Sequence, residues 1–502
     1  MKSAVFFCAL VGLTVAAPAA EKESLYRCTV DTQTQSDALH KYDAFQHRWG
    51  PGAVVDVHTR SNAEARSLLA LLPCTLKIAD IYNHHPVVNG TFQIQNTAAL
   101  AVDPFFTNYQ RYDAFIAKLV SWSQTHSDIV TYYPSIAVTH QKRNVPAIVI
   151  TDSSVPAANK KTIWWNGQQH AREWISGSTV MWITNQILTQ KTDPTIASWL
   201  KQFQFVVTPM NNPDGYEYTH TTNRLWRKNM RNNGATDAAS FGVDLNRNWD
   251  DGHWGVYGTT TDIRQETYCG PAPFSEPESS GTAKFIAEFP NLYSGIDFHS
   301  YSQIVMRSWG WTMNDSPNEA ILKKLGDGLV AAIASIHQVK YTSEKAAQLY
   351  PASGCTDDYM STKLGMAGFT IELRDTGNYG FQLPPSQIVP VGEEIWGAMQ
   401  YYVNFLIQNP NIPPQIPKTK STTTTTTVLK TSAKTTITTT TVSKTTTAVS
   451  SCAHNKCVTG VALKSACDPC VSKIVAADSY CGSTSWDATC VGEVKSICGI
   501  TC

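Results

Sequence analysis

A short strand and a helix meet across a chemically distinctive turn in Thr162-Ile163-Trp164-Trp165-Asn166-Gly167-Gln168-Gln169-His170-Ala171-Arg172-Glu173-Trp174. The first four residues form an apolar run that is typical of a buried strand. The following residues, Ser176–Leu188, have a helical pattern. In the turn, His170 and Glu173 are three residues apart, so at a helix start their side chains face the same way.

Strands and helices continue to alternate from about residue 103 to residue 406. Ala147–Thr151 and Phe203–Pro209 are short apolar runs bounded by polar turns, and Ala320–Ile336 is again helical in pattern. Such alternation is typical of α/β domains, in which helices cover the sheet. We therefore predict that residues 103–409 form an α/β domain with a mixed, mostly buried sheet flanked by helices.

Two shorter segments precede this domain. Residues 1–20 contain Lys2, then an apolar stretch and small residues, which is the pattern of a secretory signal peptide. Residues 21–102 predict a small α+β unit. In it we expect strands at Tyr26–Val30, Val54–Val57 and Thr75–Ile81, and helices at Gln33–His47 and Ser61–Leu72, the second with Ser61 as its N-cap.

The cysteines subdivide the chain further. There are 13, of which Cys8 lies in the signal peptide, and secretion would allow the others to pair. Cys28 and Cys74 lie beside the first and last strands of the small unit, so a bridge between them would join neighbouring strands. Cys269 and Cys355 are the cysteines of the α/β region. We expect them to be bridged, and two free buried thiols are the alternative.

The other eight cysteines lie in the last 51 residues, which predicts a disulfide-rich module at 452–502. A metal site at Cys467-Asp468-Pro469-Cys470 is the less favoured alternative, because His454 is the one histidine nearby. Residues 410–451 are dominated by Thr, Lys and Ser and cannot bury enough apolar surface to order themselves. We expect a glycosylated linker there. The tail module is a candidate for binding a partner that the sequence does not identify.

The overall composition excludes several classes of function. Forty Lys and Arg balance forty Asp and Glu, so the chain is not a generally basic nucleic-acid binder. After the N-terminus no apolar run is long enough to cross a bilayer, so we expect no membrane span. With the signal peptide, these features indicate a secreted, extracellular protein.

His170 and Glu173 offer an imidazole nitrogen and a carboxylate oxygen, which are both good zinc ligands. A catalytic zinc site has three protein ligands and a water molecule, so a third ligand must come from elsewhere. His299 follows an apolar strand in Gly295-Ile296-Asp297-Phe298-His299 and suits that role. Taken alone, each feature has an ordinary explanation: a surface contact for the pair, and a core residue for the single histidine.

Six further motifs resemble those of a known family and make the ordinary explanations less plausible. In chain order they are Asn212-Pro213-Asp214-Gly215-Tyr216, Arg224-Leu225-Trp226-Arg227-Lys228-Asn229, Asp244-Leu245-Asn246-Arg247-Asn248-Trp249-Asp250, His299-Ser300-Tyr301-Ser302-Gln303, Tyr350-Pro351-Ala352-Ser353-Gly354 and Glu372-Leu373-Arg374-Asp375-Thr376-Gly377. With them, residues 103–408 resemble a secreted zinc metallocarboxypeptidase of the carboxypeptidase A/B type. Residues 21–100 resemble the inhibitory propeptide of that family.

The resemblance implies one Zn²⁺ per catalytic domain and substrates that are peptides or proteins with a free C-terminal carboxylate. It also implies a role for each matching residue: His170, Glu173 and His299 as zinc ligands, Glu372 as general base, Arg227 as the group that polarises the scissile carbonyl, Asn246, Arg247 and Tyr350 as the carboxylate-binding set, and Arg172 as a further cationic subsite. The chemistry agrees, because the planar fork of Arg247 suits bidentate binding of a carboxylate.

Asp357 lies seven residues after Tyr350, where the family has the floor of its side-chain pocket. An apolar residue there resembles the A type, and Asp resembles the B type. A buried carboxylate would select C-terminal Lys or Arg, which is the preference we expect. An A-like preference for large apolar residues is the alternative, because Lys345 or Arg307 could neutralise Asp357.

Two hypotheses from other functional classes compete with the peptidase hypothesis. One is a non-catalytic binding protein, which the complete set of catalytic residues disfavours. The other is a zinc deacylase or amidase, which would not need the carboxylate-binding set. For the peptidase we also expect a latent precursor. Between Lys77 and Arg111 there is no Lys or Arg, so we predict activation near residues 96–103 by a protease that accepts small or apolar residues.

Overall fold

A computed structural model of the chain describes residues 23–45, 50–79, 81, 102–234, 240–412 and 452–500, except for 459, 478–480, 482–484, 487 and 499 in the last range. The expected signal peptide, almost all of the linker and most of the expected activation region lie outside the described residues. The chain divides into two compact units, residues 1–421 and 422–502.

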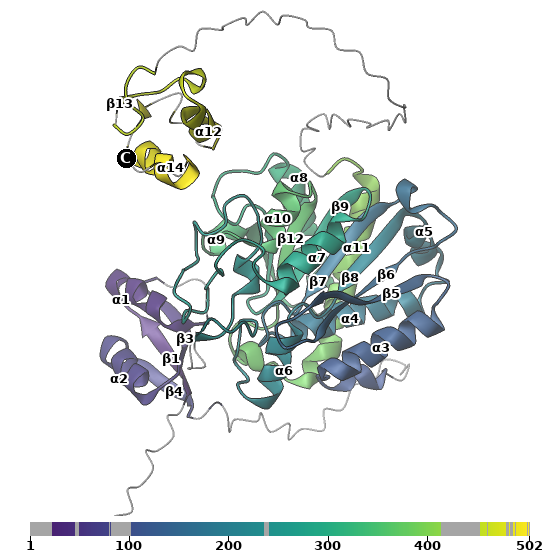
Figure 1. Cartoon of the computed structure of the whole chain (residues 1–502). Helices are drawn as coiled ribbons and strands as arrows, with labels where there is room; N and C mark the ends of the chain where they lie inside the picture. The colour runs from purple at the N-terminus through teal and green to yellow at the C-terminus, as the bar shows by residue number, and fades with distance from the viewer. Residues whose placement is uncertain are drawn as a thin grey trace, which may run out of the picture. The chain divides into compact units, whose positions relative to one another are not determined.

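The larger unit is built on an eight-stranded sheet (Figure 1). Across the sheet the order is β11 (Thr342–Lys345), β10 (Ile304–Arg307), β12 (Ala367–Leu373), β9 (Leu292–Ser300), β7 (Lys161–Gly167), β8 (Phe203–Thr208), β6 (Asn144–Ile150) and β5 (Val130–Val138). The four central strands from β12 to β8 are parallel. Strands β10 and β6 run antiparallel to their central neighbours. The predicted mixed sheet is therefore confirmed.

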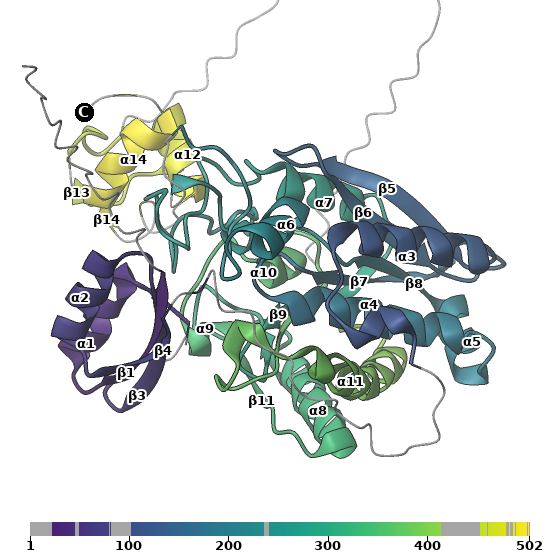
Figure 2. The same cartoon turned by 90° about the horizontal axis from the view of Figure 1, so that it is seen from below.

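Helices cover both faces of this sheet. One face packs against α3 (Tyr112–Thr125), α4 (Trp174–Thr189), α5 (Pro194–Gln202), α8 (Glu319–His337) and α11 (Ile388–Gln408), and the other against α7 (Pro277–Ala287) and α10 (Thr356–Thr362). Figure 2 shows α8 and α11 side by side. Strand β6 serves both cores, because Ile148 and Ile150 point to the first face whereas Ala147 and Val149 point to the second.

The small N-terminal part has a four-stranded sheet in the order β2 (Asp43–Ala44), β3 (Ala53–Thr59), β1 (Ser24–Val30) and β4 (Cys74–Ile78), with helices α1 (Gln33–Ala38) and α2 (Asn62–Leu71). The Ser61 side chain caps α2 by accepting a hydrogen bond from the backbone N–H of Glu64, as predicted. Cys28 and Cys74 lie opposite each other on β1 and β4 and form the expected disulfide.

The helix predicted over Gln33–His47 is wrong in its second half. Helix α1 ends at Ala38, a single 3-10 turn (Leu39–Lys41) follows, and the chain then extends into β2. The extended backbone places Asp43 against Arg172, at 2.9 Å, and the Phe45 ring against Phe381. These tertiary contacts outweigh the local helical preference of the sequence.

The C-terminal unit has its own core around Leu463, Ile474 and Trp486. Its elements are α12 (Pro469–Ala477), α14 (Ala488–Cys498) and a short ladder of β13 (Gly460–Val461) with β14 (Ser485–Trp486). Disulfides join Cys452 to Cys467, Cys470 to Cys498 and Cys481 to Cys490, and Cys457 is also disulfide-bonded. The predicted disulfide-rich tail is thus confirmed.

The bridge expected between Cys269 and Cys355 does not form, and both thiols are free and buried. The Cys355 sulfur lies 3.6 Å from an Arg247 guanidinium nitrogen, whereas the Cys269 sulfur lies 3.5 Å from the carbonyl oxygen of Thr260. Each sulfur therefore has a polar neighbour of its own. Burial raises the pKa of the Cys355 thiol well above its ordinary value.

Candidate active site

The residues that the sequence singled out meet at the carboxyl ends of the parallel strands. His170 and Glu173 follow the end of β7, and His299 lies near the end of β9. Glu372 lies on β12, directly opposite His299 in the strand register. In open α/β sheets this edge is the usual place for a ligand site.

The turn after β7 is held by side chain to backbone hydrogen bonds. Gln168 has a positive φ of 56°, and its backbone N–H donates to the Ser176 hydroxyl at 2.7 Å. Its side-chain amide donates to the carbonyl oxygens of His170 and Ala171, each at 3.1 Å. Because helix α4 begins at Trp174, His170 and Glu173 project from this fixed turn just before the helix.

His170, Glu173 and His299 point their ligand atoms at one another. Nδ1 of His170 is 2.7 Å from one Glu173 carboxylate oxygen, and Nδ1 of His299 is 2.8 Å from the other. The two Nδ1 atoms are 3.0 Å apart, and all three side chains are buried. Two imidazole nitrogens and a carboxylate oxygen form the donor set of many catalytic zinc sites. Because these atoms converge in a buried position, the residues fit a zinc ion.

Two acids orient the histidines, and neither was predicted from the sequence. Nε2 of His170 lies 3.0 Å from Asp244, and Nε2 of His299 lies 2.8 Å from Asp297. A carboxylate on the second ring nitrogen fixes the ring and the tautomer of a metal-binding histidine. The signal for Asp297 was its position two residues before His299, because alternate residues of a strand share one face. Asp244 lies far from His170 in the sequence and gave no such signal.

Glu372 is only 7% exposed, and its Oε2 atom has no hydrogen-bond partner among the described residues. Burial, followed by the neighbouring Glu173 carboxylate, raises the pKa of Glu372 to about 8, against the opposing effects of His299 and Arg227. A cation among the zinc-ligand atoms would lower this pKa, because positive charge favours the carboxylate. The structure therefore places, beside the predicted zinc ligands, a buried carboxyl group with one oxygen that accepts no hydrogen bond from the described part of the chain.

Three further side chains approach from the loops. Arg227 donates to Asp244 at 2.7 and 3.1 Å and has a guanidinium nitrogen 4.0 Å from Glu173. Arg247 donates to the Tyr350 hydroxyl at 2.9 Å. The side-chain oxygen of Asn246 accepts a hydrogen bond from the backbone N–H of Thr356. These groups are therefore held in fixed positions before any substrate arrives.

A narrow cavity of about 40 Å³ joins these side chains to Asp357. Asp357 is 3% exposed, and burial followed by the Asp297 carboxylate raises its pKa to about 6. The two cations that could have neutralised it bind elsewhere. Lys345 pairs with Asp315 at 2.5 Å, and Arg307 pairs with Glu319 at 2.6 Å. Among the residues that the structure describes, no ion pair involves Asp357.

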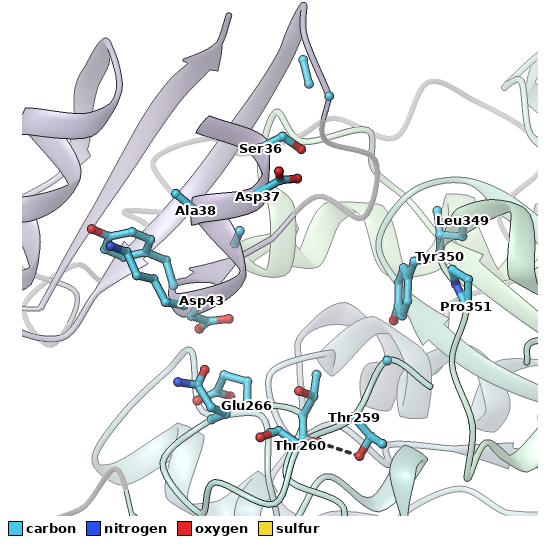
Figure 3. A pocket seen from close by; sticks show the side chains of 18 of the residues that line it. Ser36, Asp37, Ala38, Asp43, Thr259, Thr260, Glu266, Leu349, Tyr350 and Pro351 are labelled. Carbon is cyan, nitrogen blue, oxygen red and sulfur yellow. Dashed lines mark hydrogen bonds between the residues drawn. The ribbon is translucent and has the colours of Figure 1, made fainter. Parts of the chain in front are cut away.

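A larger cavity of about 1320 Å³ lies between the small N-terminal sheet and the α/β domain. Figure 3 shows Asp37 and Asp43 on the side of the small sheet, and Glu266 and Tyr350 on the side of the domain. Arg172 lines this cavity, and its guanidinium is paired with Asp43 and lies over the rings of Phe45 and Phe381. The N-terminal sheet thus occupies the predicted cationic subsite.

Comparison with known families agrees with this arrangement. Residues 115–398 match the zinc carboxypeptidase family, so the chain belongs to that family. It is a metallocarboxypeptidase of the A/B type and uses zinc. Residues 450–502 match a separate domain family whose function is unknown.

Individual relatives match at moderate identity. A metallocarboxypeptidase A-like protein of Trichophyton verrucosum is 34% identical over 60% of this chain and 71% of its own length. Carboxypeptidase B of Astacus astacus is 35% identical over 60% of this chain and 98% of its own. The crystal structure of thrombin activatable fibrinolysis inhibitor superposes with a TM-score of 0.66 at 24% identity, over 78% of this chain and all of that one. That structure supports the fold.

Among the described residues, no helix has the length and apolar character needed to cross a membrane.

Proposed function

We propose that this metallocarboxypeptidase removes C-terminal Lys and Arg from peptides and proteins, and that His170, Glu173 and His299 hold its zinc ion. Bound zinc supplies a Lewis acid that polarises the scissile carbonyl and makes water a usable nucleophile near neutral pH. The convergence of the three ligand side chains in a buried pocket, with Asp244 and Asp297 behind the histidines, supports this assignment.

Arg247, Asn246 and Tyr350 bind the free carboxylate of the substrate. The Arg247 guanidinium offers paired N–H donors, and its hydrogen bond to Tyr350 places the phenol beside it. Arg172 is a further cationic group along the cleft, for the part of the peptide that precedes the scissile bond. A site that fixes the carboxylate positions only the last peptide bond for cleavage, because the other bonds lie beyond reach.

Glu372 is the general base, and Arg227 stabilises the oxyanion. The Glu372 carboxylate accepts a proton from the attacking water and passes it to the leaving amine. Arg227, which Asp244 holds in place, presents a fixed positive charge where negative charge develops on the carbonyl oxygen. Burial of both side chains keeps these interactions out of bulk water, where they would be weaker.

The observation that carries the proposed specificity is Asp357. It is a buried carboxylate at the cavity beyond the carboxylate-binding set, and Lys345 and Arg307 are both paired with other acids. A cationic side chain of the substrate would supply the missing charge partner. An apolar side chain would instead leave a buried acid without compensation.

A release profile tests this specificity. Peptides that differ only in their last residue are incubated with the activated, zinc-loaded enzyme, and the release of Lys, Arg, Phe and Leu is compared. We expect Lys and Arg to be released fastest, and a chelator to abolish every rate. Faster release of Phe or Leu than of Arg would refute the B-like assignment and leave the A-like alternative.

We also propose that residues 21–102 are a propeptide and that the chain is secreted as a latent precursor. The pairing of Asp43 with Arg172, of Arg60 with Glu266 and of Arg27 with the Gly377 carbonyl supports latency, because these contacts connect the small sheet to the walls of the cleft. The expected boundaries are 1–20 for the signal peptide, 103–409 for the catalytic domain, 410–451 for the linker and 452–502 for the tail module.

The activation site remains a prediction. Residues 82–101 lie outside the described residues, and no Lys or Arg occurs between Lys77 and Arg111. We expect N-terminal sequencing of the active enzyme to begin near residues 96–103. A mature N-terminus directly after Lys77, or after an earlier Arg or Lys, would show that a trypsin-like protease activates the precursor.

A further inference from the structure

A second group of metal-ligand side chains lies outside the active site. It consists of His140, in the turn between β5 and β6, and of Glu276 and Glu278, at the N-cap and in the first turn of α7. Each offers a ligand atom, and these atoms all lie within 4.8 Å of one another. Neither the zinc chemistry nor the carboxylate binding described above uses this group.

Glu276 is fully buried and has polar partners on both carboxylate oxygens. Oε1 accepts hydrogen bonds from Arg231 at 3.0 Å and from the Ser275 hydroxyl at 2.7 Å. Oε2 accepts from the Asn229 side chain at 2.8 Å and lies 2.8 Å from Nε2 of His140. The carboxylate is therefore held in one orientation, which is what a rigid ligand site requires.

Glu278 is also fully buried, but its partners are incomplete. One oxygen accepts a hydrogen bond of 3.2 Å from Asn229. The other, Oε1, has no hydrogen-bond partner among the described residues. The ligand atoms of the two buried glutamates lie within 4.8 Å of each other, so the oxygen of Glu278 that has no partner among the described residues is left for a further ligand.

We propose that His140, Glu276 and Glu278 bind a second divalent cation, of the zinc type, that joins the β5–β6 turn to the start of α7. One imidazole nitrogen and two carboxylate oxygens are a donor set that suits zinc. The Oε1 atom of Glu278 accepts no hydrogen bond from the described residues, so it is available to bind the ion. Asn229 and Arg231 act as the outer partners that orient the carboxylates.

The surroundings also provide access for the ion. His140 is 30% exposed along its side chain, whereas both glutamates are fully buried. An ion can therefore reach the imidazole from solvent and remain bound against the two buried acids. None of its three ligand residues takes part in the proposed mechanism, so its existence does not depend on the proposed function.

Metal stoichiometry tests this site directly. The full chain, with its disulfides intact, is stripped with a chelator and then equilibrated with free Zn²⁺ before the bound zinc is measured by mass spectrometry. We expect two equivalents in the parent protein and one in His140→Gln and Glu278→Gln. His170→Gln should lose the other equivalent, so the two sites are counted separately. A single equivalent in the parent would overturn the proposal.

His337→Gln is the matched control, because His337 also lies between two glutamates, Glu393 at 3.2 Å and Glu394 at 3.1 Å. It should retain both equivalents. Glu278→Gln keeps the shape of the side chain, and circular dichroism verifies that each variant is folded. In the His170→Gln background, zinc should raise the melting temperature, and adding Glu278→Gln should remove that rise. Two equivalents in both site variants would refute the site.

Discussion

Buried acids behave differently in two regions of this molecule. Where the small N-terminal sheet meets the α/β domain, Asp43 lies between the Arg172 guanidinium and the His58 ring. Burial alone would raise the pKa of Asp43, but these two groups hold it well below its ordinary value. In the active site, Asp357 and Glu372 are equally buried, yet their pKa values are raised to about 6 and about 8.

This difference in pKa distinguishes two kinds of place in the molecule. We call the pairing of Asp43 with Arg172 and His58 the closed contact, and the surroundings of Asp357 and Glu372 the open site. A buried acid that is paired with a cation of the other part supports the association of the two parts, because loss of either partner would leave the other charge buried and unpaired. A buried acid that lacks such a cation is costly, and such groups gather where a ligand or a reaction supplies the missing partner. On this basis we propose that Asp43 maintains latency, whereas Asp357 and Glu372 interact with the substrate and with the attacking water.

Removing the acid that faces the reaction should have the largest effect. Glu372→Gln keeps the shape of the side chain but cannot accept the water's proton, so we expect kcat to fall by roughly 10³-fold. The measurement is hydrolysis of a blocked dipeptide by activated enzyme, with its zinc content determined in parallel as the control. Near-normal turnover in zinc-loaded Glu372→Gln would remove Glu372 from the mechanism.

Removing Asp357, the acid proposed to bind the substrate side chain, should alter selectivity. Asp357→Asn discards the charge at constant size, and we expect the ratio of kcat/KM for Arg-ending over Leu-ending peptides to fall on the order of 100-fold. Asp357→Ile should reverse the preference toward large apolar residues. Asp327→Asn is the control, because the Asp327 side chain is exposed and pairs with Lys323 at 2.6 Å, away from the residues that line the cavity. If Asp357→Asn leaves the ratio unchanged, Asp357 does not select the substrate.

The closed contact can be opened by a similar change. Asp43→Asn leaves the buried Arg172 without its carboxylate, so the uncleaved precursor should gain activity, by roughly tenfold for each 1.4 kcal/mol lost. Asp37→Asn is the matched control, because Asp37 lines the same cavity but is exposed and accepts from Gln33 instead. A precursor as latent as the parent after Asp43→Asn would show that this ion pair does not maintain latency.

The sequence predicted the features that follow from family motifs and from local pattern. His170 and Glu173 follow one apolar strand and His299 follows another, but it was the resemblance to the carboxypeptidase family that assigned all three to one zinc site. The Ser61 cap was predictable from local pattern, since a capping hydrogen bond spans only three residues.

Contacts between distant residues could not be predicted in this way. Helix α1 ends early because Phe45 packs on Phe381, which lies more than 300 residues away in the sequence. The orientation of His170 by Asp244 is likewise a long-range contact. Cys269 and Cys355 were expected to pair because they stood alone in the α/β region, but composition does not report where each sulfur points.

The smallest expected effect comes from protonation at the closed contact. His58 is buried between Asp43, at 3.1 Å, and Glu23, at 2.8 Å, and Asn223 of the α/β domain also donates to Glu23. Burial alone would lower the pKa of His58, but the two carboxylates raise it from 6.5 to about 9. Arg172 faces Asp43 from the α/β domain, and Arg60 also acts on both acids electrostatically.

Because the folded-state pKa of His58 lies above its ordinary value, its contribution to stability is complete below about pH 6.5 and is lost as pH rises through 9. Between pH 7 and 8 the free energy of unfolding falls by on the order of 1 kcal/mol, because the folded state binds close to one proton more than the unfolded state. We therefore expect the free energy of unfolding of the small N-terminal part, followed in the uncleaved precursor by hydrogen exchange of its strands, to fall by on the order of 1 kcal/mol from pH 7 to 8. His58→Gln should flatten this dependence, whereas His337→Gln should preserve its slope. Protection that is independent of pH in the parent would show that the charge on His58 does not stabilise this part.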